Sequence, residues 1–176
     1  MSLFGSIRDV SLFRNVNREL LHRIIDTNVL VYQLNLNSTT TNLYDESDKK
    51  VYNTPVLVPV LVTLDNEQWN SDDYGSEITQ TALFSFLRDD LVDNDLPMHV
   101  GDIIEYKSRF FEIDSVYDNQ YVVGKDPDNA FAGATHGYNV SISCAAHMTR
   151  QTNLNIVQTR FGNSVSSKDV ILPKNL

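Results

Sequence analysis

The chain has 176 residues, of which 41% are hydrophobic and 21% are charged, which suits one packed domain and argues against wholesale disorder. The longest apolar run covers only residues 56–62 and contains Pro59. This excludes a transmembrane helix, which needs about 20 apolar residues. The single cysteine, Cys144, excludes an internal disulfide and a zinc site built from several cysteines. Charged Arg8 and Asp9 stand where a signal peptide would be apolar, so no signal peptide is expected.

The net charge of −9 is concentrated in the middle of the chain. Residues 26–128 carry 6 basic and 20 acidic side chains, whereas residues 1–25 and 129–176 each have a small basic excess. Phosphate contacts need clustered lysines and arginines, so this distribution argues against a dedicated nucleic-acid binder. It fits a protein that repels DNA over most of its surface, or one whose ends dock on acidic neighbours.

The strongest helix pattern follows an N-terminal arm of residues 1–11, with Ser11 as the expected N-cap. Apolar residues then recur at spacings of three and four: Leu12, Phe13, Val16, Leu20, Leu21, Ile24 and Ile25. On another face, Arg14, Arg18 and His22 lie four residues apart. This basic stripe is either a solvated helix face or a docking face for an acidic partner.

The remainder of residues 12–149 has a β pattern, rich in β-branched and aromatic residues between turn signals. Because proline cannot donate to a ladder, Pro59 should lie at a sheet edge or at a bulge. We expect strands at residues 29–34, 56–64, 79–87 (where a helix is the alternative), 100–106, 110–117, 121–123 and 138–148. We expect loops at 35–42 (or a projecting hairpin there), 65–76 and 124–137, with a short acidic connector at 89–96.

These elements predict a mainly β fold, a small barrel or sandwich of about seven or eight short strands with an N-terminal helix. Residues 150–176 are too polar for a core and should form a C-terminal arm. Alternation along the strands assigns side chains to common faces. The expected sets are Ile104 with Tyr106; Phe111, Ile113 and Ser115; and Val140, Ile142, Cys144 and Ala146.

No catalytic or ligand-binding motif is recognisable in the sequence. Cys144 and His147 should lie on opposite faces of a strand, and nothing supplies the thiol with a base. The segment 126–129 lacks the spacing of a calcium loop and is expected to form a turn. The carboxylates between Asp89 and Asp95 are interpreted as solvated surface. We therefore expect no enzymatic activity, cofactor or metal.

Trp69 is the only tryptophan and stands in a polar segment beside asparagine, aspartate and serine. Tryptophan is favoured at the centres of protein interfaces, so Trp69 is a candidate interface anchor. The alternative is a loop residue that packs on its own barrel.

Two stretches resemble the neck proteins (head-completion or stopper proteins) of contractile-tailed bacteriophages. The first is Thr39-Thr40-Thr41-Asn42-Leu43-Tyr44-Asp45-Glu46, followed by Lys50-Val51-Tyr52-Asn53-Thr54-Pro55-Val56. The second is Pro97-Met98-His99-Val100-Gly101-Asp102-Ile103-Ile104-Glu105-Tyr106, with Phe110-Phe111-Glu112-Ile113 after the turn. The resemblance spans roughly residues 13 to 148.

The resemblance implies a structural virion protein located in the phage neck, and in the host cytoplasm during assembly. The protein would form a six- or twelve-fold homo-oligomeric ring between the portal or adaptor ring and the tail-terminator or tail proteins. The ring would close the DNA-filled head, and packaged double-stranded DNA would pass through the ring without specific contacts. No membrane partner is expected. Candidate interface residues are Arg14, Arg18, His22, Asn37, Thr40, Tyr44, Trp69, Asp126, Asp128, Phe131, Arg150 and Arg160.

Other assignments remain open. A tail-terminator ring of the same connector is the nearest alternative, whereas an adaptor ring should be mostly helical. A small barrel that binds single-stranded nucleic acid or another ligand would use stacking aromatic side chains. The candidates for such stacking are Tyr106, Phe110, Phe111, Tyr117 and Tyr121.

Overall fold

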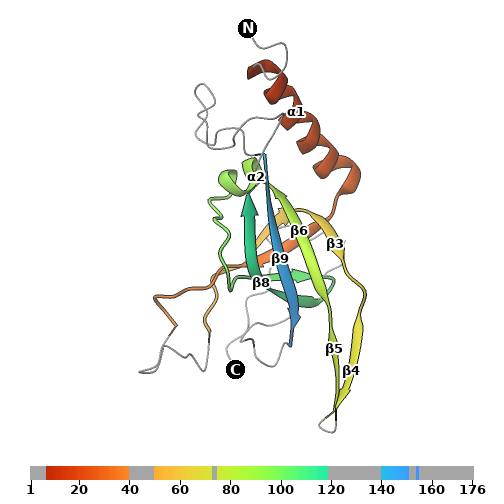
Figure 1. Ribbon diagram of the computed structural model, residues 1–176. Helices are drawn as coiled ribbons and strands as arrows, with labels where there is room; N and C mark the ends of the chain where they lie inside the picture. The colour runs from red at the N-terminus through yellow and green to blue at the C-terminus, as the bar shows by residue number, and fades with distance from the viewer. Residues whose placement is uncertain (1–6, 40–49, 73–74, 119–139, 151–153, 155–176) are drawn as a thin grey trace.

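The computed structural model describes residues 7–39, 50–72, 75–118, 140–150 and 154 (Figure 1). In these residues the fold is mainly β, as predicted, with a seven-stranded antiparallel sheet, a two-stranded sheet and an N-terminal helix. None of the helices in this part of the chain has the length and hydropathy needed to cross a membrane.

The elements follow one another in the order shown by the colours of Figure 1. The helical elements are α1 (Ile7–Glu19), which continues as the π-helix η1 (Leu20–Ile25), and α2 (Arg88–Asp93). The strands are β1 (Asn28–Tyr32), β2 (Val56–Pro59), β3 (Leu61–Leu64), β4 (Gln68–Asp72), β5 (Gly75–Thr79), β6 (Thr81–Leu87), β7 (Ile103–Tyr106), β8 (Arg109–Asp118) and β9 (Ser141–Thr149).

The seven-stranded sheet closes on itself in a barrel-like arrangement. Its strand order is β2-β1-β7-β8-β9-β6-β3, and the two outermost strands, β2 and β3, are separated in sequence only by Val60. One bent segment therefore pairs with β1 through its first half and with β6 through its second half. Pro59 ends the first half, so the interruption predicted there is confirmed as the corner of the barrel. Closure leaves few unpaired edges for other chains to pair with.

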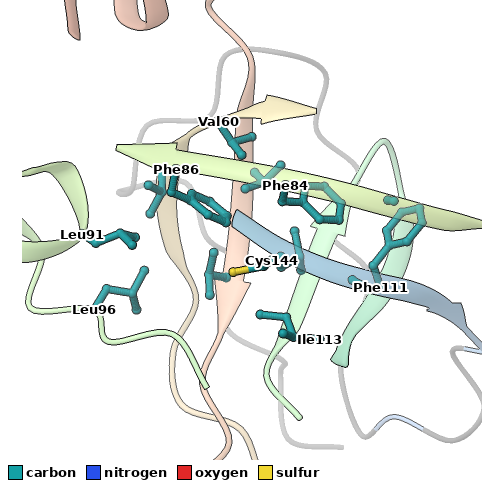
Figure 2. Packing of buried hydrophobic residues seen from close by; sticks show 14 residues of the cluster. Val60, Phe84, Phe86, Leu91, Leu96, Phe111, Ile113 and Cys144 are labelled. Atoms are coloured by element: carbon teal, nitrogen blue, oxygen red, sulfur yellow. The ribbon is translucent and has the colours of Figure 1, made fainter. Parts of the chain in front are cut away.

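The barrel interior is filled by alternate residues of the strands. Figure 2 shows Phe84 and Phe86 of β6 above Cys144 of β9, with Leu91 and Leu96 at one end of the cluster. The rings of Phe84 and Phe111 meet edge to face, with centroids 5.4 Å apart. The predicted inward face of β9 is confirmed, because Cys144 and Ala146 are buried and Ile142 packs against the same cluster.

The predicted faces of the β7–β8 hairpin are confirmed up to the middle of β8. Ile104 and Tyr106 pack in or against the interior cluster, together with Phe111 and Ile113. The prediction that Ser115 shares the face of Phe111 and Ile113 is wrong. The pairing of β8 with β9 shifts between Ile113 and Ser115, so Val116 takes the next inward position.

A second, smaller cluster covers the outer side of β1, β7 and the start of β8. Its buried members are Leu30, Tyr32, Ile103, Phe110 and Leu154. Apolar residues thus face both sides of β1, which explains its nearly uninterrupted apolar sequence. The prediction that residues 150–176 contribute nothing to a core is wrong for Leu154, which is buried here.

Two further boundaries differ from the prediction. The helix begins at Ile7, before the expected cap Ser11 and within the predicted arm. The predicted loop 65–76 instead contains β4 and the start of β5, which pair from Gln68↔Thr79 to Asp72↔Gly75. The acidic connector predicted at 89–96 is mostly occupied by the short helix α2, which begins at Arg88. The predicted strand 121–123 and loop 124–137 lie outside the described residues.

The Gly-Asp pair of the resembling hairpin has a structural role. Gly101 adopts a φ of +90°, a backbone conformation that favours glycine. The next residue, Asp102, is almost fully buried, and its carboxylate accepts hydrogen bonds from the N–H groups of Leu34 and His99, both at 2.8 Å. Asp102 therefore connects the segment after β1 to the start of β7. Burial raises the pKa of Asp102, and these two backbone hydrogen bonds act in the opposite direction.

Burial of Cys144 predicts a loss of stability in alkali. Burial, assisted by the charges of Asp102 and Asp118, raises the pKa of the Cys144 thiol to about 12, from about 8.5 in an unfolded chain. Between these values the native state binds more protons than the unfolded state, so the unfolding free energy falls as pH rises through this window. Urea unfolding at pH 8 and pH 10.5 measures this loss, and the unfolding free energy of Cys144→Ala should fall by about 2–3 kcal/mol less than that of the wild type. Equal losses would contradict the prediction.

Candidate assembly interface

The N-terminal helix is attached to the barrel through charged side chains. Arg14 of α1 forms a two-pronged contact with Asp89 of α2, in which Nε lies 2.9 Å from Oδ2 and Nη2 contacts Oδ1. Both side chains are largely shielded from solvent. Burial lowers the pKa of Arg14, and the charge of Arg88 acts in the same direction. A two-pronged arginine–carboxylate pair fixes direction as well as distance.

The next two members of the basic stripe continue the same contact. Arg18 Nε lies 3.0 Å from Asp90 Oδ1, and Arg18 Nη2 lies 2.6 Å from Asp93 Oδ2. His22 Nε2 lies 2.9 Å from Asp90 Oδ2. The hydrogen bond that Arg18 donates to Asp93 is the largest cause of the raised pKa of Arg18, and the charge of Asp90 adds to it.

The two helices are aligned in the same direction, because Arg14–Asp89 and Arg18–Asp93 both join residues 75 positions apart. The interpretation of the basic stripe as a solvated face is therefore wrong. The stripe docks on acidic residues of its own chain. The interpretation of the carboxylates as solvated surface is also wrong for Asp90, whose side chain is only 2% exposed.

The opposite side of the same helix is apolar and exposed. Leu12, Val16, Leu20 and Ile24 lie four residues apart, offset by two positions from Arg14, Arg18 and His22. Two residues are slightly more than half a turn, so the two rows face opposite ways. These four residues and the adjacent Phe13 have the following exposed fractions: Leu12 64%, Phe13 48%, Val16 55%, Leu20 42% and Ile24 73%. We call these five residues the apolar stripe.

This orientation is the reverse of the usual one, in which a surface helix buries its apolar face and exposes its charges. The end of the helix keeps the stripe straight, because the wider π-helical turns of η1 place Ile24 nearly in line with Leu20. The helix ends where Asp26 adopts a φ of +46° and its N–H donates to the carbonyl of Leu21 at 3.0 Å. The apolar stripe is therefore a preformed surface, whose shape is fixed by the helix itself.

A second exposed feature is the β4–β5 hairpin, which projects from the barrel at the end opposite α1 (Figure 1). Trp69 lies on β4 opposite Ile78 and is 69% exposed. The prediction that Trp69 packs on its own barrel is wrong. Its role as an interface anchor stays a prediction. The base of the hairpin is held by Arg109, which contacts Glu67 and Gln80.

The remaining candidate interface residues are not brought together by the described part of the structure. Asn37 lies exposed in a turn at 36–38, and Arg150 is exposed directly after β9. Six candidates lie outside the described residues, namely Thr40, Tyr44, Asp126, Asp128, Phe131 and Arg160. Sequence reasoning missed Asp89, Asp90 and Asp93. Their one-turn spacing, which matches that of the basic stripe, was the available signal.

Other chemistry is sparse in the described ranges. No group of three or more histidine, cysteine or carboxylate side chains there could hold a metal ion. An open cleft of about 420 Å³ lies between the α2 region and the end of the β8–β9 pair. Its lining is mainly apolar, including Leu91, Met98 and Val116, with Arg88 and Asp118 among the charged members.

No protein-family model matches the chain, and no curated protein matches it.

The docking of α1 on α2 predicts a specific effect of replacing Asp90, which contacts Arg18 and His22 of the basic stripe. Asp90→Ala should release the helix, since Arg18 and His22 lose a buried acceptor worth about 1–3 kcal/mol. Amide exchange at residues 12–25 should then accelerate about ten- to a hundredfold, while exchange in β6 and β9 stays slow. Asp118→Asn, an exposed carboxylate outside this contact, is the matched control. Unchanged exchange in α1 would show that the ion pairs do not hold the helix.

Proposed function

We propose that this protein is a structural subunit of a bacteriophage neck, which forms a ring that closes the DNA-filled head and joins the portal or adaptor to the tail. The observation that carries the proposal is the apolar stripe of α1. Exposed contiguous apolar surface on a soluble domain marks an interaction site. Here the helix is fixed by ion pairs, so the surface is ready to bind another polypeptide without reorganisation.

Three further features support an assembly role. The hairpin with Trp69 offers a second protruding surface at the other end of the barrel. Two sequence stretches resemble phage neck proteins, and in the second one Gly101 and Asp102 have structural roles. The acidic middle of the chain would let DNA slide through a channel, because carboxylates repel phosphates.

The barrel that binds single-stranded nucleic acid is less well supported. Base stacking requires accessible aromatic rings. Of its candidate residues, Phe110 and Phe111 are buried, and Tyr106 is partly buried against the core. Tyr117 is exposed, and Tyr121 lies outside the described residues. Phe110 and Phe111 could therefore stack on bases only if the barrel opened. A tail-terminator ring remains the alternative within the connector class.

Light scattering over a range of concentrations, with negative-stain images of the same fractions, tests the proposal. The expected result is a ring of about six or twelve subunits with a central hole. A chain that stays monomeric at every soluble concentration would overturn a self-assembling ring. A salt-dependent shift of oligo-dT by that monomer would then favour the nucleic-acid barrel.

A further inference from the structure

A second surface of the same chain has the properties that the apolar stripe needs in a partner. It is the outer side of β3, β6 and β9, on the far side of these strands from the packed interior. Alternate residues face outward there, and the register places them side by side as Leu61↔Ser85, Thr63↔Leu83, Leu83↔Ala145 and Ser85↔Ser143. We call these six residues the sheet face.

The sheet face contains no charged side chain. Leu61 is 47% exposed and Leu83 is 39% exposed, and the other members are small side chains. The hydroxyls of Ser85 and Ser143 lie 3.0 Å apart and hydrogen-bond to each other. Their polarity is thus partly satisfied within the face. The corresponding outer side of β1 and β7 is already covered by the second cluster, including Leu154.

The sheet face has the size of the middle of the apolar stripe. The stripe from Leu12 to Ile24 spans about 18 Å at the rise of an α-helix. Along β6 the sheet face runs from Leu83 to Ser85, about 7 Å, so it covers the middle of the stripe around Val16 and Leu20. Three adjacent strands are about 10 Å wide, close to the diameter of a helix. A helix packed on a sheet through apolar faces is one of the standard ways to build a layered protein.

The chain cannot readily make this contact with itself. The basic stripe fixes α1 to α2, and Figure 1 shows α1 beyond one end of the barrel. The antiparallel strands β6 and β9 extend from that end of the barrel toward the opposite one. A second copy is the occupant that the uncharged character of both surfaces favours. Two chains of net charge −9 repel each other, so self-association should occur where neither surface carries charge.

We infer that the apolar stripe of one subunit packs on the sheet face of the next subunit. The inference rests on the proposed ring and names its contact. Because the two surfaces differ, each subunit has one of each, and the contact is head to tail. Head-to-tail contacts generate a ring when the rotation closes. Pairing of two apolar stripes across a two-fold axis would instead stop at a dimer.

Two single variants test the contact. Val16→Glu places a charge in the middle of the stripe, and Leu83→Glu places one in the sheet face. Both positions are exposed, so each variant should keep the wild-type circular dichroism and melting temperature as a monomer. Each variant should raise the dissociation constant of self-association by about ten- to a hundredfold, as measured by analytical ultracentrifugation. Leu36→Glu, at a turn residue that is 75% exposed, is the control and should assemble normally.

A mixture of the two variants decides the geometry. Val16→Glu retains an intact sheet face and Leu83→Glu retains an intact stripe, so the 1:1 mixture should form a heterodimer and nothing larger. If Leu83→Glu alone still forms dimers, the stripes pair with each other and the inference is wrong. A mixture that stays monomeric also overturns it.

The result for the wild type separates this inference from the proposed function. A wild-type ring that survives both substitutions would support the ring and overturn this contact. A wild-type open filament that both substitutions dissolve would support the contact and overturn the closed ring. A wild type that is monomeric at every soluble concentration overturns both.

Discussion

Phe84→Ala is expected to lower the unfolding free energy by about 3–5 kcal/mol, the usual cost of removing a buried phenylalanine. Phe84 is fully buried and lies in the middle of β6. Its ring contacts the rings of both Phe111 and Tyr106 edge to face, with centroid distances of 5.4 Å and 6.4 Å. The closed barrel limits how far the strands can collapse onto the space that is left, so the cost should lie toward the upper end.

Urea unfolding of the unassembled subunit measures this effect. Leu83→Ala provides a control on the same strand, because Leu83 points outward and should cost less than about 1 kcal/mol. Phe84→Leu should fall between the two, since it keeps most of the apolar volume. A loss below about 1.5 kcal/mol for Phe84→Ala would show that the interior is looser than the structure indicates.

Asp102→Ala is expected to cost about 2–4 kcal/mol, because it removes the acceptor of two backbone hydrogen bonds at once. The N–H groups of Leu34 and His99 would lose their partner, and the segment after β1 would detach from the start of β7. Asp102→Asn keeps one acceptor oxygen and should cost less. Urea unfolding at neutral pH, supported by amide exchange of Leu34, gives both values. An Ala variant as stable as the wild type would contradict the role of this carboxylate.

The raised pKa of Asp102 adds a dependence on pH. The native state binds the proton more tightly than the unfolded state, so this carboxyl contributes most to stability below its unfolded pKa. The contribution falls as pH rises through the native pKa. The difference in unfolding free energy between the wild type and Asp102→Asn should therefore be larger at pH 3.5 than at pH 7, in favour of the wild type. A difference that grows with pH would mean that the two hydrogen bonds outweigh burial.

The assembly proposals depend on the unusual orientation of α1. Most helices gain their stability by burying an apolar face. In this chain, Arg14 and Arg18 hold the helix from its charged side, and exposure of the apolar stripe is the consequence. Burial of each stripe residue in an assembly would contribute up to about 1.5–3 kcal/mol, more than the ion pairs alone are expected to give.

Local patterns in the sequence were sufficient for much of the fold. Alternation in β6 and β9 correctly assigned their inward faces, and the hairpin at 100–117 was recognised from its turn and flanking aromatic residues. The four-residue spacing from Leu12 to Ile24 predicted the helix. Pro59 predicted an interruption in its strand. These features follow from the period of a helix or strand and from the backbone chemistry of single residues.

The tertiary structure decided which surfaces meet. Whether Arg14 and Arg18 would face solvent or acidic side chains depended on α2, whose Asp89 and Asp93 lie 75 residues further along the chain. The hairpin that carries Trp69 consists of polar strands, which lack the apolar alternation by which strands are recognised. Burial of Leu154 required the outer side of β1 and β7 to exist first. Spacing in a sequence fixes the side of an element on which a residue lies, whereas the partner of that side is chosen only when distant segments pack together.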